Sequence, residues 1–90
     1  MRVSVTRGGG VAGLLRVTEV EADDVPSGTV AALRAPPVPG SRRPDEMTYA
    51  VRVGDDSATF TDSTLPDEVR RLIAWVDAHP ARSERIAPPG

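Results

Sequence analysis

The sequence predicts a small single α+β domain in which a four-stranded antiparallel sheet carries two helices on one face. Two observations lead to this prediction. Short runs of alternating apolar and polar residues, typical of half-buried strands, occur four times along the 90 residues. One later segment instead has apolar residues at helical spacing, and a shorter candidate helix separates the two pairs of strands. The predicted order is β-β-α-β-β-α, within one domain over residues 1–80.

The first two predicted strands flank a glycine-rich segment. Residues 3–6 alternate cleanly, and a second alternating run covers residues 14–21. Within the second run the apolar residues change faces, which predicts a bulge or a strand end near Thr18. The connection over residues 7–13 is longer than a tight turn needs, and surplus loop is where binding residues often lie.

A short helix and a proline-rich segment come next. We expect the helix over about residues 27–34, with Ser27 or Asp24 as its N-cap. Residues 35–46 contain four prolines, which remove amide donors and bias the preceding residues toward extended backbone. We therefore predict that residues 35–46 form a flexible connector.

The second pair of strands and the main helix follow. Residues 47–53 and 57–61 alternate on either side of turn residues, which predicts a hairpin. Thr64 and Asp67 resemble a capping box ahead of a helix that should end near Ala78 or His79, before a proline. The helix has an apolar face made of Val69, Leu72, Ile73 and Val76. Residues 81–90 are expected to be a disordered tail.

Composition argues against catalysis, cofactors and nucleic acid. The chain has no cysteine and one histidine, His79, which we interpret as a helix-end residue, so we expect no metal site. The net charge of −2 and the absence of lysine argue against nucleic-acid binding and against a phosphate loop. Each acidic pair has a local explanation at a helix start or a turn: Asp23-Asp24, Asp55-Asp56 and Asp67-Glu68. We expect a protein that is not an enzyme.

No membrane segment is expected. No apolar run approaches the ~20 residues that a transmembrane helix needs. Met1-Arg2 leads directly into the first strand, without the apolar segment of a signal peptide. We therefore expect a cytoplasmic monomer, with export by another route left open.

The glycine-rich segment and its flanks carry the distinctive signature of this chain. Residues 3–16 resemble the opening of the emfourin family, small proteins that inhibit thermolysin-like (M4) zinc metalloproteases. Gly8 stands where that family often has serine, and Val11 where phenylalanine is expected. Segments 47–51 and 65–73 resemble the family as well. The positions that fit the family's glycine-loop pattern are Arg7, Gly9, Gly10, Gly13, Leu14 and Arg16.

The resemblance implies a stoichiometric inhibitor that binds in the active-site cleft of an M4 metalloprotease. A glycine-rich backbone can lie close to a substrate groove with few side-chain clashes. Val11 and Leu14 are the residues able to fill the apolar S1′ pocket, and Arg7 and Arg16 could pair with carboxylates of the cleft. The predicted protease-binding residues are Arg7, Gly8, Gly9, Gly10, Val11, Ala12, Gly13, Leu14 and Arg16.

Two other functions remain open at this stage. The chain could be a non-catalytic interaction or regulatory module with no protease target, in which the glycines only allow a hairpin to turn. It could also bind an extended peptide along a free edge of its sheet. The pair Arg42-Arg43 in the predicted connector is interpreted as solvated charge.

Overall fold

The computed structural model describes residues 1–8, 15–35 and 47–87. The strands are β1 (Arg2–Gly8), β2 (Leu15–Glu21), β3 (Thr48–Val53), β4 (Asp56–Thr61) and β5 (Ser83–Ala87), and the helices are α1 (Thr29–Arg34) and α2 (Asp67–Ala78). Most of the predicted connector, residues 36–46, lies outside the described residues, as does the pair Arg42-Arg43.

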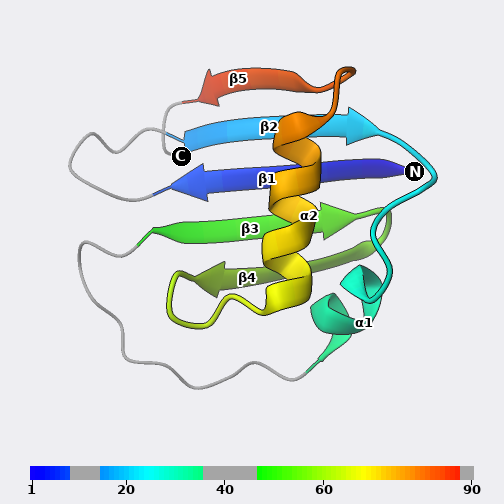
Figure 1. Ribbon diagram of the computed structural model, residues 1–90. Helices are drawn as coiled ribbons and strands as arrows, with labels where there is room; N and C mark the ends of the chain where they lie inside the picture. The colour runs from blue at the N-terminus through cyan, green and yellow to red at the C-terminus, as the bar shows by residue number, and fades with distance from the viewer. Residues whose placement is uncertain (9–14, 36–46, 88–90) are drawn as a thin grey trace.

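The five strands form one antiparallel sheet in the order β4-β3-β1-β2-β5 (Figure 1). Strand β1 lies at the centre because it pairs with both β2 and β3. Helix α2 crosses one face of the sheet from β4 toward β2, and α1 packs beside β4 and α2. The predicted α+β class, the antiparallel pairing and the two helices are therefore confirmed.

The core lies between the sheet and α2. In β1, Val3 and Val5 are fully buried, because alternate residues of a strand point to the same face. They meet the buried side of α2, and α1 adds Leu33 to the same cluster. Burying each such side chain contributes about 1.5–3 kcal/mol. The other members of the cluster are Val20, Val51, Val53, Val69, Leu72 and Val76.

The predicted bulge or strand end near Thr18 is wrong. Strands β1 and β2 pair residue for residue from Arg2↔Glu21 to Arg7↔Arg16. Thr18 takes a core position and is 0% exposed, while Val17 lies on the opposite face of the sheet. The alternation is disturbed because a threonine occupies a core site, where its β-branched side chain suits a strand.

A fifth strand corrects the four-stranded prediction. Residues 83–87, which we expected within a disordered tail, pair with β2 along its outer edge. Two ion pairs join these strands, Arg16 with Glu84 at 2.9 Å and Arg85 with Glu19 at 3.1 Å. The sequence showed no sign of this strand, because its residues 83–86 are all exposed and have no apolar alternation.

The helix ends agree only in part with the sequence. Helix α2 ends at Ala78 with His79 as its C-cap, as predicted. The capping box is wrong, because Pro66 is the N-cap and Thr64 Oγ1 instead accepts the Thr61 N–H at 2.9 Å. The N-cap of α1 is Gly28, whose φ of 85° favours glycine, and no side chain caps this helix.

Neither helix in the described part of the chain is long and apolar enough to cross a membrane.

Candidate functional site

The candidate site lies at one end of the sheet, which we call the loop end (left in Figure 1). Here β1 and β4 end and β2 and β3 begin, so four neighbouring strands bring their terminal side chains together. The residues of this end are 7–8, 15–16, 48–49 and 60–62. The predicted protease-binding segment starts and finishes at this end.

Three of the nine predicted binding residues are described by the structure. Arg7 and Arg16 face each other as partners in the β1–β2 pair, and Gly8 is the last residue of β1. The strands therefore bring the two arginines that bracket the segment together. The other six predicted residues lie outside the described part of the chain: Gly9, Gly10, Val11, Ala12, Gly13 and Leu14.

The close packing at Gly8, and not an unusual backbone angle, is what favours glycine there. Its φ is not positive, in contrast to that of Gly28 and Gly54. A Cβ placed on Gly8 would lie 2.5 Å from Leu15 Cδ2, closer than carbon atoms can approach without movement. The Thr48 hydroxyl donates to the Gly8 carbonyl oxygen at 3.2 Å. Because Gly8 has no side chain, Leu15 packs directly against the end of β1, where the glycine-rich segment begins.

Arg7 and Arg16 both form ion pairs within the chain. The Arg7 guanidinium donates through Nη2 to the carboxylate of Asp77 on α2, and its side chain is only 15% exposed. Arg16 is 50% exposed and pairs with Glu84 on β5. Two elements from the C-terminal part of the chain therefore hold the two ends of the glycine-rich segment.

A third polar contact ties β3 to the turn after β4. The Tyr49 hydroxyl donates to Asp62 Oδ1 at 2.8 Å, and Arg70 Nη2 donates to the Asp62 carbonyl oxygen at 3.0 Å. Burial raises the pKa of Tyr49, and the hydrogen bond to Asp62 raises this pKa further. The Tyr49 hydroxyl therefore stays protonated and serves as a hydrogen-bond donor at neutral pH.

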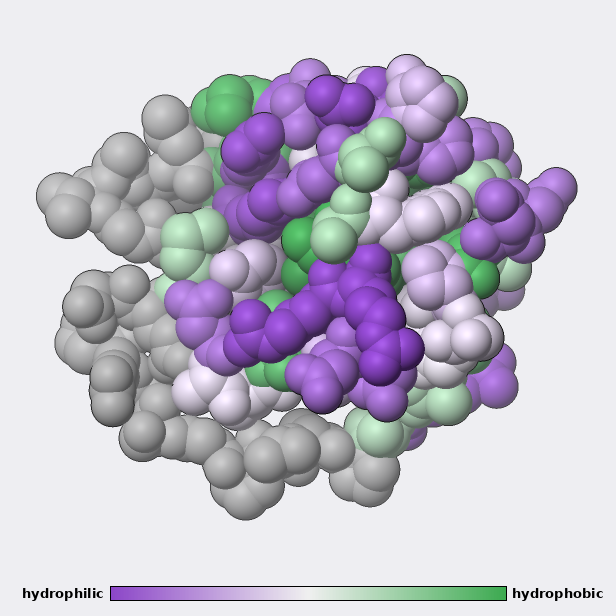
Figure 2. All heavy atoms as spheres, in the orientation of Figure 1, coloured by the Kyte–Doolittle hydropathy of each residue, from purple (hydrophilic) through white to green (hydrophobic). Residues whose placement is uncertain are grey.

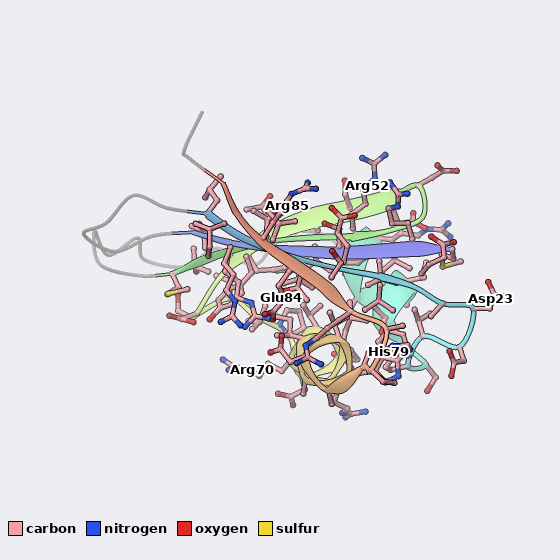
Figure 3. All side chains as sticks on the ribbon, turned by 90° about the horizontal axis from the view of Figure 1, so that it is seen from above. Asp23, Arg52, Arg70, His79, Glu84 and Arg85 are labelled. Atoms are coloured by element: carbon pink, nitrogen blue, oxygen red, sulfur yellow. The ribbon has the colours of Figure 1, made fainter. Side chains whose placement is uncertain are left out.

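A shallow hollow of about 240 Å³ opens between α2 and these contacts. Figure 2 shows hydrophilic side chains gathered over this face, with hydrophobic ones visible between them. In Figure 3, Arg70 extends from α2 on the side toward the loop end. The hollow is lined by Arg7, Tyr49, Leu65, Arg70, Ile73, Ala74 and Asp77.

A sequence model of the emfourin family matches residues 5–77, from β1 to nearly the end of α2. The chain belongs to the emfourin family. This membership points to a metalloprotease-inhibitor role with a protease as the partner, and it is consistent with the prediction that the chain is not an enzyme. No curated protein and no solved structure matches the chain.

The emfourin match covers the whole glycine-rich segment but not β5. Arg16 therefore lies within the matched region, whereas its partner Glu84 lies beyond it. By contrast, Arg7 and Asp77 both lie within the match, and so does every residue that lines the hollow.

The other candidate residues contact groups of the chain itself. His79 packs edge-to-face on Trp75, with ring centroids 5.1 Å apart, and its Nδ1 accepts the Ala81 N–H at 3.1 Å. Asp56 accepts two hydrogen bonds from Arg34, at 2.8 and 3.2 Å. Within the described residues, no three His, Asp or Glu side chains come together as a metal site requires. The interpretation of His79 as a helix-end residue agrees with its place as the C-cap of α2, whereas Asp56, expected in a turn, is the first residue of β4 and binds Arg34 of α1.

Sequence reasoning missed the residues that secure this end, above all Asp77. It lies 70 positions from Arg7, so no local spacing could connect the two. A partial signal was present, because Asp77 follows Ile73 by one helical turn and therefore had to lie beside the apolar face of α2. Nothing in the sequence showed which strand end it would meet.

A second hollow, of about 290 Å³, lies beside β4, the outer strand of the sheet on that side. An extended peptide bound along a sheet edge would lie here, as in the peptide-binding alternative. The lining residues are Leu33, Ala35, Ser57, Ala58, Thr59, Phe60 and Thr64.

Proposed function

We propose that this protein inhibits thermolysin-like (M4) zinc metalloproteases by occupying the active-site cleft, one inhibitor to one enzyme. The observation that carries the proposal is the emfourin match over residues 5–77, which contains the whole glycine-rich segment. The geometry of the loop end supports it, because both ends of that segment are anchored to a packed sheet. Anchored ends lower the conformational entropy that the segment loses on binding.

In this proposal the segment from Arg7 to Leu14 makes the main contact. Its glycines leave the backbone bare enough to approach the walls of a groove, and Val11 and Leu14 supply apolar side chains for the S1′ pocket. Arg7 and Arg16 would contact carboxylates of the cleft by exchanging their present partners. Arg16 exchanges more readily, because its side chain is 50% exposed and that of Arg7 only 15%.

Removal of the catalytic zinc is not part of this mechanism. Residues 7–16 contain no His, Cys, Asp or Glu, the usual side-chain ligands of zinc. Inhibition should therefore arise from exclusion of substrate, and added zinc should not reverse it.

The direct test is a titration of a thermolysin-like protease with the purified protein. We expect activity to fall linearly to zero near one equivalent and to be unchanged by added zinc. Full activity at a large molar excess, for several M4 proteases, would overturn the proposal and leave the interaction module without a protease target.

Two variants locate the contact. Gly9→Trp fills the bare backbone, and the double change Val11→Asp/Leu14→Asp removes both apolar groups, so each should abolish tight inhibition. The matched control Ala31→Asp/Ala81→Asp adds the same charge at exposed positions outside the segment and outside both hollows, and it should inhibit like the unaltered protein. Unchanged inhibition by both loop variants would move the contact to another surface.

A further inference from the structure

The hollow beside α2 adjoins the base of the glycine-rich segment. Arg7, two positions before Gly9, forms part of its wall, and Tyr49 and α2 form much of the rest. Arg7 belongs both to the hollow and to the proposed binding segment from Arg7 to Leu14, so a protein that contacts the base of this segment lies next to the hollow. The volume of about 240 Å³ accommodates a carboxylate side chain with an adjoining apolar group.

Arg70 is the exposed cation of this hollow and has no ion-pair partner among the described residues. The other cation, Arg7, is paired with Asp77, whereas the Asp62 carboxylate accepts the Tyr49 hydroxyl and forms no ion pair with Arg70. Arg70 itself is exposed and donates to a backbone carbonyl oxygen at 3.0 Å. Among the described residues no carboxylate lies within ion-pair distance of Arg70. Its guanidinium remains available to an anionic group from outside.

The apolar part of the lining favours a carboxylate carried by a side chain. Leu65 and Ile73 pack against the core and also line the hollow, and Ala74 completes this wall. A docked group covers Arg70 on one side and lowers the local dielectric constant, which strengthens an ion pair. The Arg70 guanidinium would repel a basic side chain, and a purely apolar one would cover the charge without offering it a counter-ion.

We infer that this hollow is a second contact surface for the protease, and that it accepts an Asp or Glu side chain whose carboxylate pairs with Arg70. The inference rests on the proposed function, because the partner is the metalloprotease held by the glycine-rich segment. It adds a carboxylate-binding contact on α2 to the contacts that we propose for the glycine-rich segment.

The test compares two neighbouring arginines of α2. Arg70→Glu reverses the charge at the hollow, whereas Arg71→Glu makes the same change at an exposed position that does not line it. The dissociation constant for the protease and the residual protease activity are both measured for each variant. We expect Arg70→Glu to raise the dissociation constant about tenfold or more and Arg71→Glu to change it less than about threefold. Arg70→Gln should fall between them, and Arg70→Lys should restore most of the affinity.

The two readouts separate this inference from the proposed function. Binding that is weakened by Arg70→Glu but not by Arg71→Glu supports the hollow as a contact, whether or not the bound protease is inhibited. If the two variants bind equally well, the inference that the hollow contacts the protease is wrong, and the inhibitor proposal is unaffected. Binding without inhibition overturns the cleft-blocking function alone, and absence of any binding by the unaltered protein overturns both. The unfolding midpoints of the variants, followed by Trp75 fluorescence, confirm that each one is folded.

Discussion

The two ends of the sheet are stabilised by different kinds of contact. At the end opposite the loop end, which we call the turn end, the row of side chains facing α2 is Val3, Val20 and Val53, all at most 2% exposed. At the loop end the corresponding row is Arg7, Arg16 and Tyr49. Along one face of one sheet, apolar packing thus gives way to ion pairs and hydrogen bonds.

The backbone differs in the same way. At the turn end the Gly54 N–H donates to the Arg2 carbonyl oxygen, and the Ala22 N–H to that of Met1, each at 2.9 Å. The turn end also has ion pairs, of the Met1 amino group with Glu21 at 2.9 Å and of Arg34 with Asp56 at 2.8 Å. Only at the loop end, however, is the row that faces α2 itself charged, with Arg7 paired to Asp77 and Arg16 to Glu84. Apolar burial stabilises without specifying direction, whereas an ion pair fixes a direction. The turn end therefore supplies stability, and the loop end supplies the position of the segment that it carries.

The largest expected effect is at the turn end. Val3→Ala removes two buried methyl groups from a 0% exposed site and should lower the free energy of unfolding by about 2–3 kcal/mol. Ser4→Ala, on the other face of the same strand, should change it by less than about 0.5 kcal/mol. Urea denaturation followed by Trp75 fluorescence measures both. Similar losses for the two variants would mean that the apolar row does not dominate stability.

The ion pairs of the loop end should rank next. Asp77→Ala leaves the Arg7 guanidinium, 15% exposed, without its counter-ion and should cost about 1–3 kcal/mol. Glu84→Ala breaks the more exposed pair with Arg16 and should cost less than about 1 kcal/mol. A double-mutant cycle of Asp77→Ala with Arg7→Met isolates the pair, and additive effects would show that it is not coupled.

Substitutions of two glycines, one at each end of the sheet, should affect stability and inhibition differently. Gly54 has a φ of 59°, so Gly54→Ala should cost about 1–2 kcal/mol of stability and leave inhibition unchanged. Gly8→Ala should cost less than about 1 kcal/mol, because the flexible end of Leu15 can move aside. It should nevertheless weaken inhibition, because the base of the binding segment moves with Leu15. Denaturation measures the stability of both variants, and protease titration measures their inhibition. A loss of inhibition in Gly54→Ala alone would contradict this expectation.

The smallest expected effect is the pH response of Tyr49, the single tyrosine of the chain. Its pKa is raised in the folded protein by burial and by Asp62, so the folded state holds the phenolic proton more tightly than the unfolded state. This contribution is fully present below the unfolded pKa of about 10 and is lost as pH rises through the folded pKa. Absorbance at 295 nm should therefore show a phenol pKa above 10 that falls in Asp62→Asn. An unchanged pKa of Tyr49 in Asp62→Asn would show that Asp62 does not raise it. Tyr49→Phe should flatten the pH dependence of stability in this range.

The sequence predicted much of the sheet because its signals there are local. The alternation of Val3 and Val5, and the turn residues before β4, each depend on neighbours a few positions away. The prediction failed at Thr18, where a polar residue occupies a core site, and at β5, whose residues 83–86 are exposed. In both places hydrophobic alternation, the signal on which strand prediction depends, is missing.

For the candidate site, the sequence identified a segment but not its supports. Gly8 was recognised as part of the glycine-rich stretch, but its closeness to Leu15 became visible only when β1 and β2 were paired. Arg7 and Arg16 were expected to reach toward a protease, and the structure places each against a carboxylate of the chain itself. Whether they also contact a protease stays a proposal.

By itself, the sequence determined the α+β class, the order of the first six elements and the family, because these depend on short-range periodicity and on a contiguous motif. Only the tertiary structure decided that β5 completes the sheet, that Asp77 secures the strand end at Arg7, and that Arg70 stands at a hollow beside it. The physical reason is distance along the chain. These contacts join groups that are brought together only when α2 and β5 pack on the sheet, and no local pattern records which charges will then be neighbours.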